Sequence, residues 1–160
     1  MNCQARLSGL GEKWDRRFLD MARLASTWSK DPSTKCGAVI VRPDRSIVST
    51  GYNGFPKGCS DDPALYADRP TKLERVVHAE ENAILQAKCD VSGFIMYTWP
   101  PGPGPSCARC TSSIINAGIT CVVHGHPSNA NGFNERWMES IQHGLDMYEQ
   151  AGVVVISYPV

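Results

Sequence analysis

His78-Ala79-Glu80 is followed, 29 positions after its histidine, by Cys107-Ala108-Arg109-Cys110. The two stretches supply one imidazole, two thiolates and one further carboxylate. Three protein ligands with an open fourth position are typical of a catalytic zinc site, because a structural site fills all four positions. The sequence therefore predicts one zinc ion held by His78, Cys107 and Cys110, with the Glu80 carboxylate beside it free for proton transfer.

The chemistry of this set follows from its residue types. Zinc makes hydroxide available near neutral pH. We expect Glu80 to take a proton from the attacking water and pass it to a ring nitrogen of the substrate, and a second proton from Glu80 to make ammonia the leaving group. Aspartate would be one methylene too short for this shuttle. The combined H-x-E and C-x-x-C pattern nearly matches the signature of zinc nucleobase deaminases.

Both motifs lie where helices are expected to begin, at His78 and at Cys107. The first turn of a helix presents unpaired N–H groups and partial positive charge, which favour thiolate over thiol. Positions 78 and 80 are two apart, so an ideal helix would splay their side chains by about 200°. They can serve one metal only if it lies over the helix end. We therefore expect two helix N-termini to meet at the site.

Two other interpretations of the motifs stay open at this point. A C-x-x-C at a helix start also describes a thiol-redox site, in which Cys107 and Cys110 would work without zinc. A closed structural zinc site would need a fourth ligand, for which the candidates are Cys59, His124 and His126. The two histidines are expected in an exposed loop after a strand.

Composition limits the class of protein. The chain has 160 residues, 42% of them hydrophobic and 20% charged, which suits one soluble domain over residues 1–160 with a flexible N-terminus over about 1–11. Sixteen basic and sixteen acidic residues give a net charge of zero, so no footprint for DNA or RNA is expected. No run of 18 apolar residues is present, which predicts no membrane span.

Cysteine usage and the N-terminus indicate the compartment. Seven cysteines form an odd set without a small disulfide framework. Cys36, Cys89 and Cys121 lie in apolar or helical runs and are expected to be buried free thiols. No secretory leader is visible at the N-terminus. We therefore expect a reducing, cytoplasmic location.

The hydrophobic periodicity predicts the element order α-β-β-α-β-α-β-α-β, an α/β fold with helices on both faces of a mostly parallel sheet whose first hairpin is antiparallel. Helices are expected over 12–29, 77–88, 107–117 and 134–150, and strands over 37–41, 47–50, 94–98, 119–123 and 153–156. Residues 51–70 and 99–106 read as loops. Thr71 to Glu74 could be a capping box. The last helix is expected to point Trp137, Ile141, Leu145 and Tyr148 inward.

A longer stretch carries a more specific signal. Residues 51–62 read Gly-Tyr-Asn-Gly-Phe-Pro-Lys-Gly-Cys-Ser-Asp-Asp, and this run closely resembles deoxycytidylate (dCMP) deaminases. The resemblance continues at residues 30–41, 78–84, 114–119 and 151–153, and covers about residues 18–155. By itself, Asn-Gly within this run would indicate a simple turn.

The resemblance implies a three-layer α-β-α cytidine-deaminase-like fold with a five-stranded mixed sheet. It implies zinc-dependent hydrolysis of dCMP to dUMP and ammonia in pyrimidine deoxynucleotide metabolism. Zinc would be held by His78, Cys107 and Cys110, with Glu80 as the proton shuttle. It further implies that Asn53 hydrogen-bonds the deoxyribose and that the Ala79 N–H holds the pyrimidine carbonyl.

The resemblance also implies regulation and assembly. Many members of the family are homohexamers that are activated by dCTP, inhibited by dTTP, and bind magnesium with the effector. The loop that contains Lys57, Gly58, Cys59 and Asp61 would lie near such an effector site. No clean motif fixes the residues that bind the substrate phosphate. The candidates are Lys57, Arg69, Arg75 and Arg109, each of which could equally be a solvated surface charge.

The chain departs from the family pattern in one loop. Residues 99–106 read Trp-Pro-Pro-Gly-Pro-Gly-Pro-Ser, which is longer than usual, and Ser106 separates Pro105 from the first cysteine ligand. We expect Trp99 and Ser106 to lie near the base, and the prolines to hold the loop in one shape. The altered wall predicts tolerance of a substituent at carbon 5 of cytosine. An insertion that bulges into solvent is the alternative.

Other small cytosine compounds, such as dCTP, cytidine or a 5-substituted dCMP, are the alternative substrates. A deaminase of tRNA or DNA is less favoured, because it would need a basic, aromatic-lined track for the strand. A catalytically silent regulatory subunit is disfavoured by the intact Glu80.

Overall fold

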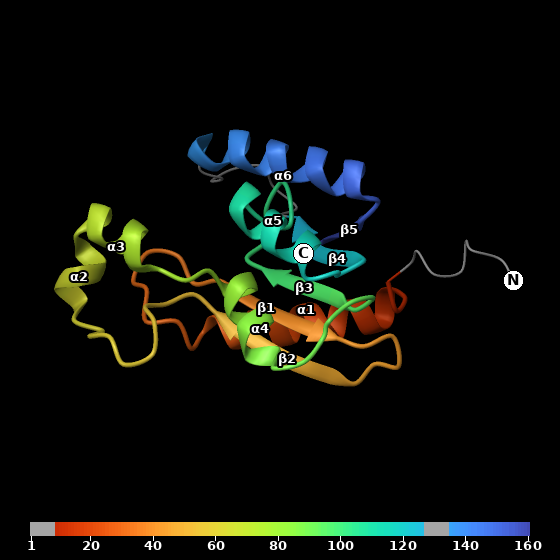
Figure 1. Cartoon of the computed structure of the whole chain (residues 1–160), viewed down its shortest axis with the longest axis horizontal. Helices are drawn as coiled ribbons and strands as arrows, with labels where there is room; N and C mark the ends of the chain where they lie inside the picture. Colours follow the sequence, from red (N-terminus) through yellow and green to blue (C-terminus); the bar gives the residue numbers. More distant parts are fainter. Residues whose placement is uncertain (1–8, 127–134) are drawn as a thin grey trace, which may run out of the picture.

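A five-stranded sheet forms the centre of the protein (Figure 1). The computed structural model describes residues 9–126 and 135–160. The strand order is β2-β1-β3-β4-β5. The bounds are β1 Gly37–Val41, β2 Ile47–Tyr52, β3 Ile95–Trp99, β4 Cys121–His126 and β5 Val154–Pro159. The predicted α/β class and five-stranded mixed sheet are confirmed.

The sheet is less parallel than the sequence predicted. Strand β1 pairs antiparallel with both β2 and β3, whereas β3, β4 and β5 pair in parallel. Strands β2 and β3 run in the same direction, and β1 lies between them in the opposite direction, so both pairs that include β1 are antiparallel. The expectation of a mostly parallel sheet was therefore wrong for the β1–β3 pair.

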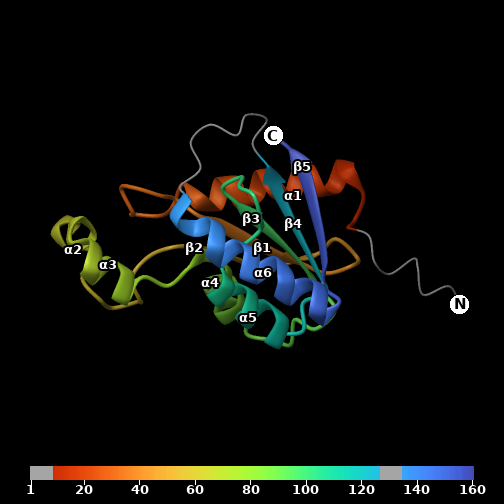
Figure 2. The same cartoon turned by 90° about the horizontal axis from the view of Figure 1, so that it is seen from above.

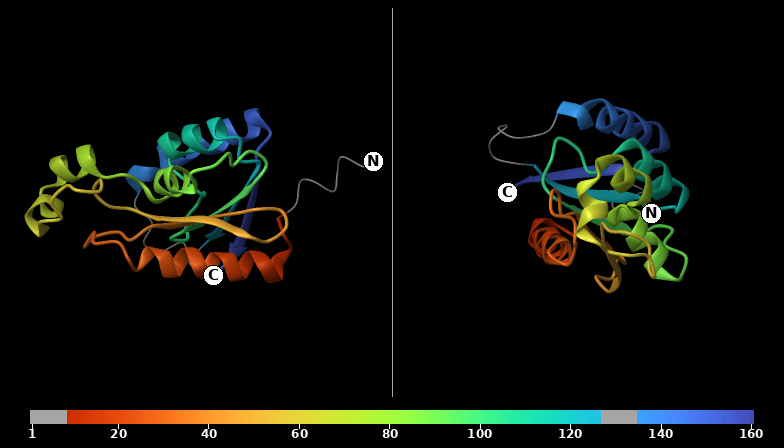
Figure 3. Two further views of the ribbon diagram at one scale, coloured as in Figure 1. Left: turned by 60° about the horizontal axis from the view of Figure 1, so that its bottom comes forward. Right: turned by 90° about the vertical axis from the view of Figure 1, so that its left-hand side faces the viewer.

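Helices cover both faces of the sheet, in the three layers that were expected (Figure 3). Helix α1 (Glu12–Ser26) covers one face, and α4 (Ala79–Ala87), α5 (Ala108–Asn116) and α6 (Met138–Ala151) cover the other. Strand β1 is buried throughout, so its alternate residues serve both layers. Val39 and Val41 pack with α1, and Ala38 and Ile40 pack with α4 and α5.

Two glycines allow helices to approach the sheet closely. A Cβ at Gly37 would lie 2.0 Å from the carbonyl oxygen of Ala22 in α1. A Cβ at Gly51 would lie 2.2 Å from the carbonyl oxygen of Ala79 in α4. Gly51 therefore fixes how deeply the first turn of α4 sits against β2, and with it the position of the residues beside Ala79.

The segment predicted as a loop over residues 51–70 is partly helical. It contains α2 (Pro63–Ala67) and leads into α3 (Arg69–Arg75), which together extend from the body as an arm (Figures 1 and 2). Asp62 caps α2 through the N–H of Ala64, and Asp68 is the N-cap of α3. The capping box predicted at Thr71 was wrong, because Thr71 lies inside α3.

Three further expectations on burial were wrong. Trp137 lies in a short 3₁₀ helix (Glu135–Trp137) and is 37% exposed, whereas Ile141 and Tyr148 point inward as predicted. Cys89 is exposed, because it follows the end of α4. His124 is buried, because β4 extends to His126 rather than ending at residue 123. Residues 1–8 lie outside the described part, so the flexible N-terminus stays a prediction.

The buried His124 has a consequence for acid stability. Burial, together with a smaller effect of the nearby His126, lowers the pKa of His124 to about 4. An unfolded histidine has a pKa of about 6.5. As the pH falls, the histidine of the unfolded state takes up a proton before the buried His124 does. The contribution of His124 to the free energy of unfolding is therefore fully present above about pH 6.5 and is lost as the pH falls toward 4. At pH 5 this single group should cost about 2 kcal/mol of unfolding free energy.

We expect His124→Asn to flatten the decline of the melting temperature between pH 7.5 and 5, measured with zinc in excess. His143→Asn, at an exposed position on α6, is the matched control and should keep the wild-type slope. Equal slopes for both variants would contradict the assignment to His124.

No helix within residues 9–126 and 135–160 has the length and apolar character that a bilayer span requires.

Candidate active site

Two helix N-termini bring the predicted zinc ligands together. His78 is the N-cap of α4 and Cys107 is the N-cap of α5, while Cys110 lies one turn further along α5. His78 Nδ1 lies 3.5 Å from Cys107 Sγ and 3.3 Å from Cys110 Sγ. The three donor atoms all lie within 4.8 Å of one another. The meeting of two helix ends, expected from the sequence, is the arrangement in the structure.

The spacing of these donors fits zinc. Zn–N bonds of about 2.0–2.1 Å and Zn–S bonds of about 2.3 Å, arranged tetrahedrally, place neighbouring ligand atoms roughly 3.5 Å apart. The imidazole–thiolate separations lie close to this value. One imidazole and two cysteines also form a donor set that zinc prefers over harder cations. His78, Cys107 and Cys110 could therefore hold a zinc ion.

The site favours a thiolate. Interaction with the Cys110 thiol lowers the pKa of Cys107 to about 4, and His78 contributes in the same direction. The same pair interaction raises the pKa of Cys110. Hydrogen bonding to Cys107 raises the pKa of His78, and desolvation raises the pKa of Glu80. Cys107, Cys110 and His78 therefore share protons as one thiolate, one thiol and one imidazole. A bound dication would displace these shared protons.

The alternatives to an open zinc site lose support. Among the described residues, the three-donor group contains neither Cys59, His124 nor His126, so no fourth protein ligand closes it. A thiol-redox site would not need an imidazole within 3.5 Å of both sulfurs. The geometry therefore favours an open, three-ligand metal site.

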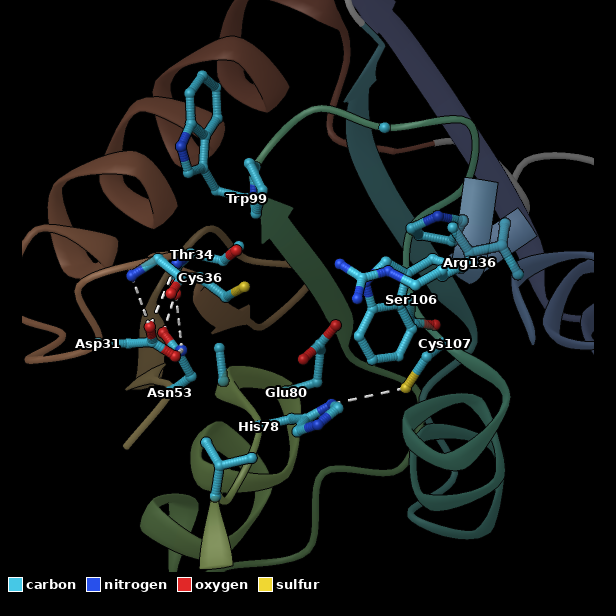
Figure 4. A pocket seen from close by; sticks show the side chains of 18 of the residues that line it. Asp31, Thr34, Cys36, Asn53, His78, Glu80, Trp99, Ser106, Cys107 and Arg136 are labelled. Carbon is cyan, nitrogen blue, oxygen red and sulfur yellow. Dashed lines mark hydrogen bonds between the residues drawn. The ribbon is translucent and has the colours of Figure 1, made fainter. Parts of the chain in front are cut away.

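A cavity of about 540 Å³ opens beside these donors (Figure 4). His78, Glu80 and Cys107 form part of its wall, whereas Cys110 is buried behind them. All four residues predicted to contact substrate also line it: Asn53, Ala79, Trp99 and Ser106. Ala79 opens α4, so its N–H has no acceptor within the helix and is free to bind a ligand.

Asn53 is largely committed to the protein itself. Its Oδ1 accepts a hydrogen bond from the Cys36 N–H at 2.8 Å. Its Nδ2 donates to the Thr34 carbonyl at 2.9 Å and lies 3.4 Å from Asp31 Oδ2. An amide oxygen has two lone pairs, so one acceptor position of Asn53 is left for a ligand hydroxyl.

The Trp99–Ser106 loop is a wall of the cavity rather than a bulge into solvent. Gly102 N–H donates to the Gly125 carbonyl at 3.0 Å. Gly104 packs on α6, since a Cβ there would lie 2.5 Å from Ile141 Cγ2. The indole of Trp99 packs with the α1 layer, where the Arg23 guanidinium lies 6.0 Å from its ring centre. Figure 4 shows this ring directed away from Glu80, so the indole is not placed to contact a base held beside Glu80.

Apart from Arg69, the residues predicted for an effector or phosphate lie elsewhere. Lys57, Gly58, Cys59, Asp61 and Arg109 do not line this cavity. Asp61 forms an ion pair with Lys30, and Lys57 lies 3.3 Å from the amide oxygen of Gln86. Arg109 makes two hydrogen bonds to the Glu81 carboxylate and so joins α5 to α4. Arg75, a further phosphate candidate, also lies outside the cavity wall.

Several residues of the cavity were not predicted from the sequence. Arg69, Lys72, Leu73 and Val76 line it from one face of α3 and its end, and Arg136 lines it from the 3₁₀ helix. Only Arg69 was named as a phosphate candidate. The spacing 69, 72, 73 and 76 is that of one helix face and was a signal available in the sequence. Lys72 is bound by the buried carboxylate of Asp31 at 2.7 Å, which anchors the arm to the body.

Comparison with known proteins identifies the family. The model of the family described as "Cytidine and deoxycytidylate deaminase zinc-binding region" matches residues 12–126. An uncharacterized deaminase in the luxG 3′ region of Aliivibrio fischeri is 46% identical over 149 residues, covering 92% of this chain and 95% of that protein. Human deoxycytidylate deaminase is 40% identical over 119 residues, covering 69% of this chain. The aligned part is 64% of the human protein's own length.

A solved structure agrees in fold. The dCMP deaminase of cyanophage S-TIM5, crystallised with dCMP and dUMP, superposes with a TM-score of 0.68. It is 24% identical and covers 92% of this chain and 98% of its own. The expected cytidine-deaminase-like fold is thereby confirmed. The chain is a member of the cytidine and deoxycytidylate deaminase zinc-binding family.

Proposed function

We propose that this protein is a zinc-dependent hydrolase that converts dCMP to dUMP and ammonia. The observation that carries the proposal is a carboxylate, Glu80, in a cavity beside an open His-Cys-Cys donor group. Membership of the family and 40% identity to deoxycytidylate deaminases support the choice of dCMP.

Each residue of the group has a distinct part. His78, Cys107 and Cys110 would hold the zinc ion, which when bound makes hydroxide available near neutral pH. Glu80 accepts one proton of the attacking water at its carboxylate and delivers it to the ring nitrogen beside the attacked carbon. It then takes the second proton from the same oxygen and delivers it to the departing amino group, which leaves as ammonia. Desolvation raises the pKa of Glu80, which strengthens the carboxylate as a proton acceptor. The substrate amino group must therefore lie between Glu80 and the donor group.

Two further residues can orient the nucleotide. The Ala79 N–H, at the positive end of α4, suits the pyrimidine carbonyl oxygen. The remaining acceptor position on Asn53 Oδ1 suits a deoxyribose hydroxyl.

The phosphate would bind at the rim where the arm meets the cavity. Arg69 of α3 lines this rim, and among the described residues it has no ion-pair or hydrogen-bond partner. An arginine can form a bidentate, charge-assisted pair with a phosphate.

We expect Arg69→Ala to lower kcat/KM for dCMP about tenfold while leaving that for deoxycytidine nearly unchanged. Arg75→Ala, on the same helix but outside the cavity, is the control. Equal losses on both substrates would contradict a phosphate role.

The function is tested by ammonia release from dCMP, CMP, dCTP, deoxycytidine and 5-methyl-dCMP. The expected result is the highest kcat/KM on dCMP. A preference for dCTP or for 5-methyl-dCMP would replace dCMP by the corresponding alternative substrate, and no ammonia from any of them would overturn the proposal.

Assembly and control are further parts of the proposal. By the family resemblance, we expect a homohexamer activated by dCTP with magnesium, inhibited by dTTP, and located in the cytoplasm. Light scattering gives the oligomer, and the same ammonia assay with each effector tests regulation. A monomer indifferent to both nucleotides would contradict these expectations.

A further inference from the structure

One face of α6 contacts the turn that carries the first cysteine ligand. Ser140, Gly144 and Tyr148 are spaced four residues apart and therefore share a helix face. Ser140 Oγ accepts a hydrogen bond from the Ala108 N–H at 3.0 Å. The Tyr148 hydroxyl lies 2.8 Å from Ser106 Oγ. The residues on both sides of Cys107 are thus held by α6, which follows the part of the chain matched by the family model.

The hydrogen bonds have a defined direction. Thr111 Oγ1 donates to the Cys107 carbonyl at 3.0 Å and lies 2.9 Å from Ser106 Oγ. A hydroxyl carries a single hydrogen, so Thr111 must accept from Ser106, and Ser106 must accept from Tyr148. The chain of donors therefore runs from Tyr148 through Ser106 and Thr111 to the main chain of the metal ligand. All three hydroxyl residues are buried, where such chains are strengthened by low polarity.

The glycine in the middle of the face permits this contact. A Cβ at Gly144 would lie 2.7 Å from Thr111 Oγ1 and 3.3 Å from the Ser106 carbonyl oxygen. Any larger residue at position 144 would separate α6 from the turn. Close approach and hydrogen bonding thus act on the same two residues, Ser106 and Thr111.

We propose that the Ser140–Gly144–Tyr148 face of α6 is a positioning surface for the Cys107 thiolate. Fixing the carbonyl of Cys107 and both neighbouring residues fixes the main chain from which its sulfur projects toward His78. Groups that orient a metal ligand typically change metal affinity 10–100-fold when removed. The inference rests on the zinc site of the proposed function and adds to it a role for Ser106, Thr111 and Tyr148.

The test compares two tyrosine hydroxyls on opposite faces of the sheet. Tyr148→Phe removes the one in the donor chain. Tyr158→Phe, the matched control, removes a hydroxyl that lies 2.9 Å from Asp15 Oδ2 in the α1 layer. The measurement is the rate at which a chelator takes zinc from the folded protein, together with the thiolate charge-transfer absorption of the cobalt-loaded form. We expect about tenfold faster release and a shifted cobalt spectrum for Tyr148→Phe, and wild-type behaviour for Tyr158→Phe.

A second pair of variants guards against a folding defect. Thr111→Ser keeps the hydroxyl and should release zinc at the wild-type rate, whereas Thr111→Val should release it about tenfold faster. Wild-type release from both Tyr148→Phe and Thr111→Val would overturn the positioning role while leaving the zinc site intact. Absence of zinc from the wild-type protein would instead overturn the proposed function, and this inference with it.

Discussion

Glu80→Gln is expected to fold and to bind zinc, but to lose turnover by about 10²–10⁴-fold, which is the usual contribution of a general acid–base group. Glutamine has the same shape and keeps a hydrogen-bonding oxygen, but it cannot accept and return a proton. Glu80 forms part of the cavity wall, whereas the metal donors are His78, Cys107 and Cys110, so metal binding should survive the change.

The measurement is kcat for ammonia release from dCMP, with the zinc content determined on the same sample. Glu149→Gln, an exposed residue near the end of α6, makes the same chemical change outside the site and should keep full activity. A Glu80→Gln enzyme with a tenth of the wild-type kcat would show that another group carries the protons.

Cys110→Ser should lose both the bound zinc and all measurable activity. A serine hydroxyl stays protonated near neutral pH and is a poor zinc ligand, whereas zinc sites in proteins are built from thiolate, imidazole and carboxylate. Cys110 is buried behind the cavity wall, so no water-exposed group can easily take its place. Cys107→Ser should behave in the same way.

Metal analysis after gel filtration, and the shift in melting temperature on adding a chelator, measure this result. Cys121→Ser is the control, because Cys121 is buried in the α1 layer on the other face of the sheet. It should lower the melting temperature yet keep one zinc per chain. A Cys110→Ser protein with full zinc occupancy would exclude this cysteine as a ligand.

The parts of the site that follow local rules could be predicted from the sequence. His78 and Cys107 stand at helix starts because the apolar periodicity begins directly after them, and the structure places both as N-caps. Helix α3 escaped prediction because Asp68 and Pro70 read as loop residues, although they also suit a helix N-terminus. The face that Arg69 and Lys72 present to the cavity was missed with it.

Other features depend on partners distant in the chain. Whether the Trp99–Ser106 loop is a wall or a bulge is decided by the contacts of Gly102 with Gly125 and of Gly104 with Ile141. The burial of His124 depends on β5, which pairs alongside β4 as far as His126. No periodicity within the loop or strand itself contains that information.

The spacing of the donors along the chain has a consequence for folding. His78 precedes the segment that contains α4 and β3, and Cys110 follows it, so a shared ion would close a loop of about 30 residues. In the chain-entropy description, a permanent link of that span restricts the unfolded chain by roughly 3–4 kcal/mol. A metal that can exchange has this effect as long as it remains bound, so zinc should hold the start of α4 against the start of α5. The supply of zinc would then set how long each molecule persists, as well as how fast it works.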